Sequence, residues 1–256
     1  MLDYWTMFTS VRVLSDNGPV RVELARWRDR LVVVKKLKMP SQFMLERLKR
    51  EAEVLRKLEH PNIIPLLATE GDRLVYAYVP GVNLSEALEA GAFPLRRSLK
   101  IIDDVLNALA YAHRNNVIHF DVKPGNILVK GDLALLGDFG FAKDMGLTGI
   151  TSEGMMLGTP NYMAPEQFRG ERNDPRSDLY SAGAVLYHML SGAPPYGSQV
   201  LRFLVGDKQI SLTPLSEELE PIAEIVYKAL SHNPMNRYQS AEEMIKDLDE
   251  VMTPSY

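Results

Sequence analysis

Three short strings, which follow one another in a fixed order between His119 and Glu166, constrain this chain more than any other feature. They read H-F-D-V-K-P-G-N, D-F-G and G-T-P-N-Y-M-A-P-E. An isolated D-F-G or A-P-E is common and carries little information. Their order and spacing are hard to obtain by chance, and this is what makes the pattern specific.

The polar side chains of the first two strings suit the transfer of a phosphoryl group. Such a transfer needs metal ions on the charged oxygens, a carboxylate to orient the attacking hydroxyl and a cation to position the phosphates. Asp138 and Asn126 offer oxygen ligands that suit Mg²⁺, and Asp121 offers a carboxylate without a metal role. Lys123 follows closely after Asp121 and adds a positive charge.

The segment between Asn126 and Asp138 predicts a β-hairpin. Two short apolar runs, 127–129 and 133–136, flank the turn Lys130-Gly131-Asp132. Such a hairpin would hold Asn126 at its entry and Asp138 at its exit, on the same side of a cleft.

Length and composition allow one large domain or two packed lobes, because the chain has 256 residues, 46% of them hydrophobic and 24% charged. The net charge of −4, without a long basic run, argues against a nucleic-acid partner. No window approaches the apolar length of a membrane span and no signal peptide is visible, so we expect a soluble chain without membrane contact. The absence of cysteine excludes disulfides and thiolate chemistry, and fits a reducing compartment.

The character of the sequence changes near residue 80. Before it, β-branched or alternating runs predict strands, and a helix is expected from Ser41 onward. The predicted strands cover 11–14, 20–26, 31–37, 63–68 and 74–79. After residue 80, helical patterns dominate, and they cover 84–88, 99–113, 179–190, 218–230 and 241–251.

Taken together, these motifs resemble the protein kinase domain, most closely the eukaryotic-like Ser/Thr kinases of bacteria. The resemblance covers about residues 11–251. It implies a single domain, 1–256, with an α+β, bilobal fold: a small antiparallel sheet with one main helix in 1–79, and a larger, mainly helical lobe in 80–256. It also implies ATP with Mg²⁺, or Mn²⁺, as cofactors, protein substrates, and a monomer or weak dimer. The implied location is the cytoplasm, either for this chain alone or for it as the cytoplasmic domain of a longer, membrane-anchored protein.

The resemblance places a nucleotide between the two lobes. V-V-V-K-K is similar to the strand motif V-A-I-K, which makes Lys35 the phosphate-positioning lysine and Glu51 its ion-pair partner, with Lys36 and Glu53 as neighbouring alternatives. Tyr76 is implied as a bulky gate behind the adenine, although its hydroxyl could equally satisfy a core hydrogen bond. The other residues implied around the adenine are the backbone of Ala77 and Val79 and the apolar walls Leu14, Val22, Val33 and Leu128.

In the second lobe, the resemblance makes Asp121 the catalytic base, Lys123 a stabiliser of the transferring phosphoryl group, and Asn126 and Asp138 the metal ligands. Thr159 resembles the residue that contacts Asp121 and Lys123 in Ser/Thr-specific kinases. Two further implied roles are structural: Glu166 would pair with Arg237, and Asp178 would anchor the catalytic loop. Apart from the resemblance, His119 is expected to pack in the core rather than to act as an acid or base. The candidate phosphorylation sites of the activation segment are Thr148, Thr151 and Ser152.

The loop that should cover the phosphates departs from the family pattern. Residues 14–22 read L-S-D-N-G-P-V-R-V, so that Ser15, Asn17 and Val20 stand where the family has glycines. Glycines allow close approach of the backbone, whereas Pro19 has no N–H and Val20 disfavours positive φ. We therefore expect a weakened phosphate lid and loose binding of ATP.

Three functional classes remain open. The first is an active kinase that phosphorylates Ser or Thr on proteins, itself included. The second is a pseudokinase that acts as a scaffold or binding module; the altered loop favours it, and the intact polar motif residues argue against it. The third is a small-molecule phosphotransferase of the same fold, which would lack the peptide-substrate platform that G-T-P-N-Y-M-A-P-E resembles. No G-x-x-x-x-G-K-[ST] occurs, which excludes a P-loop nucleotidase.

A second departure generates a testable prediction. Phe120 replaces the arginine that in many kinases pairs with a phosphorylated residue of the activation segment, and a phenyl ring cannot make that charge-assisted bond. Activation by phosphorylation of Thr148, Thr151 or Ser152, if it occurs, should therefore not work through position 120. The measurement compares the activity of phosphatase-treated protein with that of Thr151→Ala and Ser152→Ala. A collapse of activity that Phe120→Arg rescues would contradict this expectation.

Overall fold

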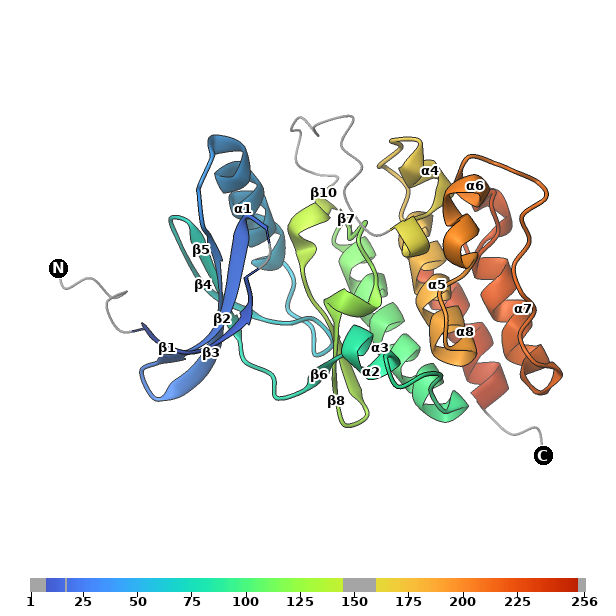
Figure 1. Cartoon of the computed structure of the whole chain (residues 1–256), viewed down its shortest axis with the longest axis horizontal. Coiled ribbons are helices and arrows are strands. Elements are labelled where there is room, and N and C mark those ends of the chain that lie inside the picture. The colour runs from blue at the N-terminus through green and yellow to red at the C-terminus, as the bar shows by residue number, and fades with distance from the viewer. Residues whose placement is uncertain (1–7, 17, 145–159, 253–256) are drawn as a thin grey trace.

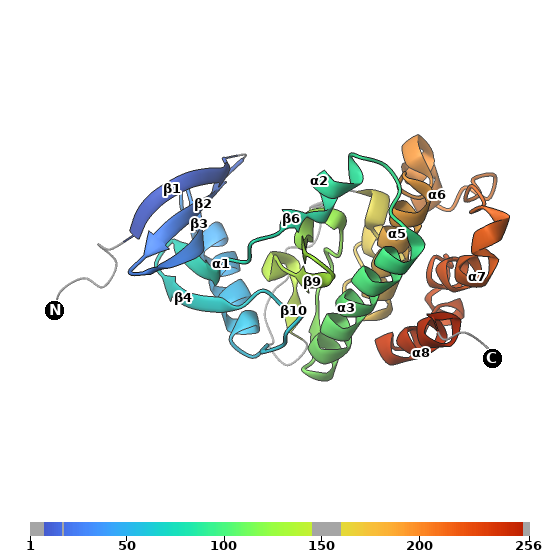
Figure 2. The same cartoon turned by 90° about the horizontal axis from the view of Figure 1, so that it is seen from below.

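A computed structural model describes residues 8–16, 18–144 and 160–252 of the chain. A twisted sheet with one helix forms one end of the molecule, and a group of helices forms the other (Figure 1). Short strands lie between these two parts, as the view from below also shows (Figure 2). This arrangement confirms the expected bilobal α+β fold. None of the helices in the described ranges has the length and apolar character that crossing a membrane requires.

The sheet is antiparallel and five-stranded, in the order β1-β2-β3-β5-β4. Its strands are β1 (Phe8–Ser15), β2 (Val20–Trp27), β3 (Arg30–Leu37), β4 (Leu66–Glu70) and β5 (Arg73–Ala77). Alternation along β3 decides its faces: Val32 and Val34 are buried on one face, while Val33 and Lys35 lie on the other. The face that carries Lys35 is the one on which the site is built.

The predicted strand 63–68 was wrong at its start, because β4 begins only at Leu66. The preceding residues pair with the other part of the molecule instead. The N–H of Ile64 donates to the carbonyl of Leu136 at 3.0 Å, and the N–H of Leu136 donates to the carbonyl of Asn62 at 2.8 Å. Pro65, which has no N–H, separates this pairing from β4. The segment therefore connects the two parts.

Helix α1 (Gln42–Leu55) is the one helix that packs on the described sheet, against β4 and β5. Ser41 caps it, as the sequence predicts, because its hydroxyl oxygen accepts the N–H of Met44 at 3.3 Å. The buried face of α1 includes Leu48, Ala52 and Leu55, together with one charged residue, Glu51. A buried carboxylate needs donors around it, and this one points into the site.

The other part is mainly helical. Its helices are α2 (Leu84–Leu88), α3 (Leu95–Arg114), α4 (Pro165–Phe168), α5 (Arg176–Ser191), α6 (Val200–Leu204), α7 (Glu220–Ala229) and α8 (Ala241–Met252). The core helix is α5, which packs against α3 and α7, while α3 also packs against α8. The sequence missed the short helices α4 and α6, although it predicted α2, which is as short as α6.

Short strands join the two parts. They are β6 (Val82–Asn83), β7 (Val117–Ile118), β8 (Ile127–Lys130), β9 (Leu133–Leu136) and β10 (Lys143–Asp144). The predicted hairpin is confirmed: β8 pairs with β9 from Ile127 opposite Leu136 to Lys130 opposite Leu133. Strand β6 extends this pair to a three-stranded sheet, and β7 pairs with β10.

The contact between α5 and α7 gives a prediction for stability. A Cβ added to the buried Gly183 would lie 2.6 Å from the Cβ of Ala229. Alanine favours a helix by about 1 kcal/mol over glycine, but overpacking a core costs about 1–3 kcal/mol. We expect Gly183→Ala to lower the free energy of unfolding, measured by urea denaturation, by about 1 kcal/mol.

The matched control is the same substitution in an Ala229→Gly background, where the space is open. There Gly183→Ala should be neutral or stabilising relative to Ala229→Gly alone. An equal loss in both backgrounds would show that the close approach of α5 and α7 is not the cause.

Candidate active site

One ammonium group lies between two carboxylates where the sheet meets the rest of the molecule. Lys35 of β3 donates to both carboxylate oxygens of Glu51 at 2.9 Å and to Oδ1 of Asp138 at 2.8 Å. The Tyr76 hydroxyl of β5 donates to Oε1 of Glu51 as well. The neighbouring alternative Lys36 lies apart from them, with its Nζ 4.0 Å from Asp72. The structure thus pairs Lys35 with Glu51.

The charges in this cluster shift one another's pKa. Burial by itself would raise the pKa of Asp138, but the Lys35 ammonium outweighs it and lowers this pKa to about 2. Burial would lower the pKa of Lys35, yet the carboxylates of Glu51 and Asp138 raise it. The pKa of Glu51 is raised, because burial outweighs the nearby ammonium. Asp138 therefore stays ionised at any pH near neutrality.

A second group of polar side chains surrounds Asp121, in the loop between β7 and the 3₁₀ turn Pro124–Asn126. Its Oδ2 accepts a hydrogen bond from Lys123 Nζ at 2.7 Å and one from Asn126 Nδ2 at 2.9 Å. The same Asn126 nitrogen donates to the backbone carbonyl of Asp121 at 2.7 Å. These bonds hold the carboxylate in one orientation.

The hairpin β8–β9 and His119 bring the two groups together. The carbonyl of Asn126 accepts the N–H of Gly137 at 2.9 Å, directly before Asp138. The ring of His119 accepts the N–H of Asp121 at Nδ1, at 3.1 Å, so Nε2 carries the proton and donates to the carbonyl of Gly137 at 3.0 Å. The charge of Lys123 adds to that of Lys35 in lowering the pKa of Asp138.

Asp178 of α5 holds the loop that carries Asp121. Its Oδ2 accepts the N–H of His119 at 2.8 Å, and its Oδ1 accepts the N–H of Phe120 at 2.8 Å. The ring nitrogen Nε2 of His113, which the sequence did not assign to the site, lies 2.8 Å from Oδ2. Phe120 takes a positive φ of 61°, a conformation that non-glycine residues rarely adopt. Two N–H groups aimed at one buried carboxylate stabilise this turn.

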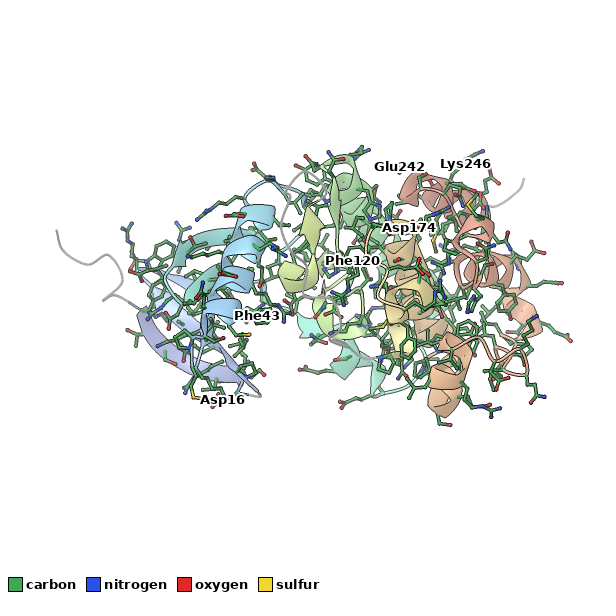
Figure 3. All side chains as sticks on the ribbon, turned by 90° about the horizontal axis from the view of Figure 1, so that it is seen from above. Asp16, Phe43, Phe120, Asp174, Glu242 and Lys246 are labelled. Atoms are coloured by element: carbon green, nitrogen blue, oxygen red, sulfur yellow. The ribbon has the colours of Figure 1, made fainter. Side chains whose placement is uncertain are left out.

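The Phe120 side chain is itself buried, near the middle of the molecule (Figure 3). Its backbone carbonyl accepts a hydrogen bond from Gln167 of α4 at 2.9 Å. An arginine at this position would have to bury its guanidinium or push it out. Any rescue experiment with Phe120→Arg therefore requires proof that the variant folds.

The ion pair expected between Glu166 and Arg237 is present and fully buried. Arg237 Nη1 and Nη2 lie 2.6 and 2.8 Å from the two oxygens of Glu166, and the hydroxyl of Ser177 donates to Oε1 at 2.6 Å. This bidentate pair joins α4 to the segment that precedes α8. It fixes the chain just after residue 159 against the helical core.

The residues expected around the adenine come from the five-stranded sheet, from the connection between β5 and β6, and from β8. Val33 stands opposite Tyr76 in the sheet, and Val22 opposite Lys35. Leu14 is 42% exposed on β1. Leu128 lies on β8 beside this connection, since a Cβ on Gly81 would be 3.4 Å from its Cγ. The N–H of Ala77 already donates to the carbonyl of Pro65 at 2.9 Å, and is therefore not available to an adenine.

The turn between β1 and β2 is held by a residue that sequence reasoning missed. Lys38, just after β3, lies 2.7 Å from the Asp16 carboxylate and donates to its backbone carbonyl at 2.6 Å. The N–H of Lys38 donates to the carbonyl of Pro19 at 2.9 Å. Asp16 lies at the tip of this hairpin (Figure 3). No local pattern signals the contact, because it forms only when three strands align.

The donor set fits a divalent metal ion that is shared with phosphates. Among the residues that the structure describes, no group of three or more His, Cys, Asp or Glu side chains is placed to hold a metal alone. Mg²⁺ requires no such cage, since it commonly takes one or two protein carboxylates and receives its other ligands from phosphates and water. Asp138 offers one such carboxylate, and Asn126 offers an amide oxygen. The expected activation-segment residues Thr148, Thr151, Ser152 and Thr159 lie outside the described residues.

Comparison with known proteins gives a family match over most of the chain. The family described as "Protein kinase domain" matches residues 16–248. The chain is 35% identical over 270 residues to the serine/threonine-protein kinase PknB of Mycobacterium leprae, covering 93% of this chain and 42% of that protein. It is 32% identical over 255 residues to the serine/threonine-protein kinase PrkC of Bacillus subtilis, covering 93% of this chain and 39% of that protein. The chain thus spans about two fifths of the length of these relatives.

The anchoring role of Asp178 can be tested by a substitution that preserves shape. Asp178→Asn turns one acceptor into a donor that faces a backbone N–H, which leaves a buried group unsatisfied. We expect a loss of about 3 kcal/mol in the free energy of unfolding. Asp174→Asn is the matched control, because Asp174 pairs with Arg176 near the surface, where an ion pair contributes about 1 kcal/mol or less. Equal effects in urea denaturation would show that Asp178 is not an anchor.

Proposed function

Because the chain belongs to the protein kinase domain family, we propose that it transfers the γ-phosphoryl group of ATP to Ser or Thr hydroxyls of protein substrates, itself included. The observation that carries this proposal is the grouping of Asp121, Lys123 and Asn126, with Lys123 also lowering the pKa of Asp138. Relatives named serine/threonine-protein kinases support the choice of hydroxyl.

Each side chain has one task in this reaction. Asp121 would accept a hydrogen bond from the substrate hydroxyl and receive its proton as the new bond to phosphorus forms. Lys123, which lies 2.7 Å from this carboxylate, would face the charge that develops on the transferring group. Lys35 would position the phosphates, and Glu51 would orient Lys35.

Members of this family use ATP and a divalent metal ion, and we propose Mg²⁺, with Mn²⁺ as an alternative. Asp138 and Asn126 are the residues that would hold it. A bound ion would supply positive charge against the phosphate oxygens. The pKa of about 2 at Asp138 means that protons do not compete for this ligand near neutral pH.

We further propose that residues 1–256 form a single domain, divided into its two lobes near residue 79, that acts in the cytoplasm as a monomer or weak dimer. The altered loop over residues 14–22 remains the reason to expect weak binding of ATP. Its turn carries Pro19, which has no N–H to offer to a phosphate.

Two substitutions test the proposed transfer. Asp121→Asn removes the proton acceptor and Asp138→Asn weakens the metal ligand, so each should lower the rate about a hundredfold or more. The measurement is the incorporation of labelled phosphate from Mg·ATP into a generic protein substrate and into the chain itself, with mass spectrometry to locate the modified residue.

Asp132→Asn is the matched control, because Asp132 is exposed in the turn between β8 and β9. It should leave the rate unchanged. If the unaltered chain transfers no phosphate, the pseudokinase alternative replaces the proposal. Transfer at the same rate by Asp121→Asn would instead refute the catalytic role proposed for Asp121.

A further inference from the structure

The Tyr76 side chain is buried, and its hydroxyl contacts the carboxylate that pairs with Lys35. Tyr76 is 8% exposed and lies on β5, opposite Val33 of β3 and Leu66 of β4. Its hydroxyl donates to Oε1 of Glu51, the oxygen that also accepts a bond from Lys35. Glu51 is thus held by two strands of the sheet while it sits on α1.

Glu51 accepts hydrogen bonds from both Lys35 and Tyr76, but it shares Lys35 with a second carboxylate. Lys35 also donates to Asp138 at 2.8 Å. If the proposed function is right, phosphate oxygens compete for the same ammonium during the reaction. The Glu51 carboxylate, 2% exposed, would then lose part of its compensation, and a buried carboxylate without donors is costly. The Tyr76 hydroxyl faces no such competition.

We propose that Tyr76 is a positioning residue, whose hydroxyl holds Glu51, and with it α1, in the arrangement that orients Lys35. The part of this inference that concerns phosphoryl transfer rests on the proposed function. The part that concerns how Tyr76 holds α1 rests on the contacts alone.

The direction of the hydrogen bond supports this assignment. Burial, together with the charge of Glu51, raises the pKa of Tyr76 well above its ordinary value. The hydroxyl therefore keeps its proton at any pH near neutrality and can act as a donor to the carboxylate throughout. Hydrogen bonds to charged groups are also stronger than those between neutral groups.

A second polar contact also holds α1 against the other part of the molecule. This contact is made by Arg47, whose Nε donates to the carbonyl of Gly140 in the D-F-G string at 2.9 Å. Gly140 allows α1 to come this close, because a Cβ there would lie 3.0 Å from Glu51 Oε2. Tyr76 fixes α1 from inside the fold.

The alternative is that the Tyr76 ring only fills space. Tyr76→Phe separates the two, because it keeps the ring and removes the hydroxyl. Hydrogen–deuterium exchange of the α1 amides around Glu51, measured without nucleotide, should become faster by about tenfold or more. In the transfer assay, kcat should fall by a similar factor while KM for ATP changes by about twofold or less.

Tyr227→Phe is the matched control, because the Tyr227 hydroxyl accepts the N–H of Leu215 at 2.8 Å, far from α1 in the helical part. It should change neither quantity. Unchanged α1 exchange in Tyr76→Phe would overturn the proposal, as would faster exchange that extends equally to the core helix α5, since the effect would then be global.

A double-mutant cycle with Glu51→Leu, which removes the acceptor of the Tyr76 hydroxyl, shows whether Tyr76 acts through the carboxylate. In the Glu51→Leu background, the effect of Tyr76→Phe on α1 exchange should shrink to about twofold or less. An undiminished effect would place the role of the hydroxyl elsewhere and overturn the proposal. Because exchange needs no turnover, a chain that transfers no phosphate would refute the proposed function and leave this test of Tyr76 intact.

Discussion

The Lys35 ammonium is the group on which the arrangement of the two parts depends. From β3 it reaches Glu51 on α1 and Asp138 beyond β9, each within 2.9 Å. Burying a positive charge costs free energy unless opposite charges lie beside it. The ammonium in turn lowers the free-energy cost of burying each carboxylate. The sheet, the helix and the D-F-G string therefore adopt their positions together. A shift of any one of them leaves a charge without its partner.

In the helical part, buried carboxylates hold neighbouring segments in place. Asp178 receives two backbone N–H groups from the loop before Asp121, and Glu166 receives the guanidinium of Arg237. Both carboxylates lie on or near the core helix α5, so that a rigid element supports an irregular loop. This division suits catalysis, because the groups that would react lie on loops while the groups that fix those loops lie on helices.

Much of the fold could be predicted from the sequence, because its signals are local. Alternation in 31–37 and the cap at Ser41 predicted β3 and α1, and two apolar runs around a turn predicted the hairpin that brings Asn126 to Asp138. The failures have a physical cause as well. The segment at Ile63 reads as a strand but pairs with β9, since periodicity does not say which partner a strand finds.

The sequence by itself determined the family, the two-part fold and the polar residues of the candidate site, because these depend on strings and periodicities within a few turns of chain. Only the tertiary structure decided which distant groups meet. Lys38 with Asp16, Tyr76 with Glu51 and His113 with Asp178 are separated by 22, 25 and 65 residues. Such pairs form because buried polar groups must find partners in space, and no local pattern along the chain records which partner each one finds.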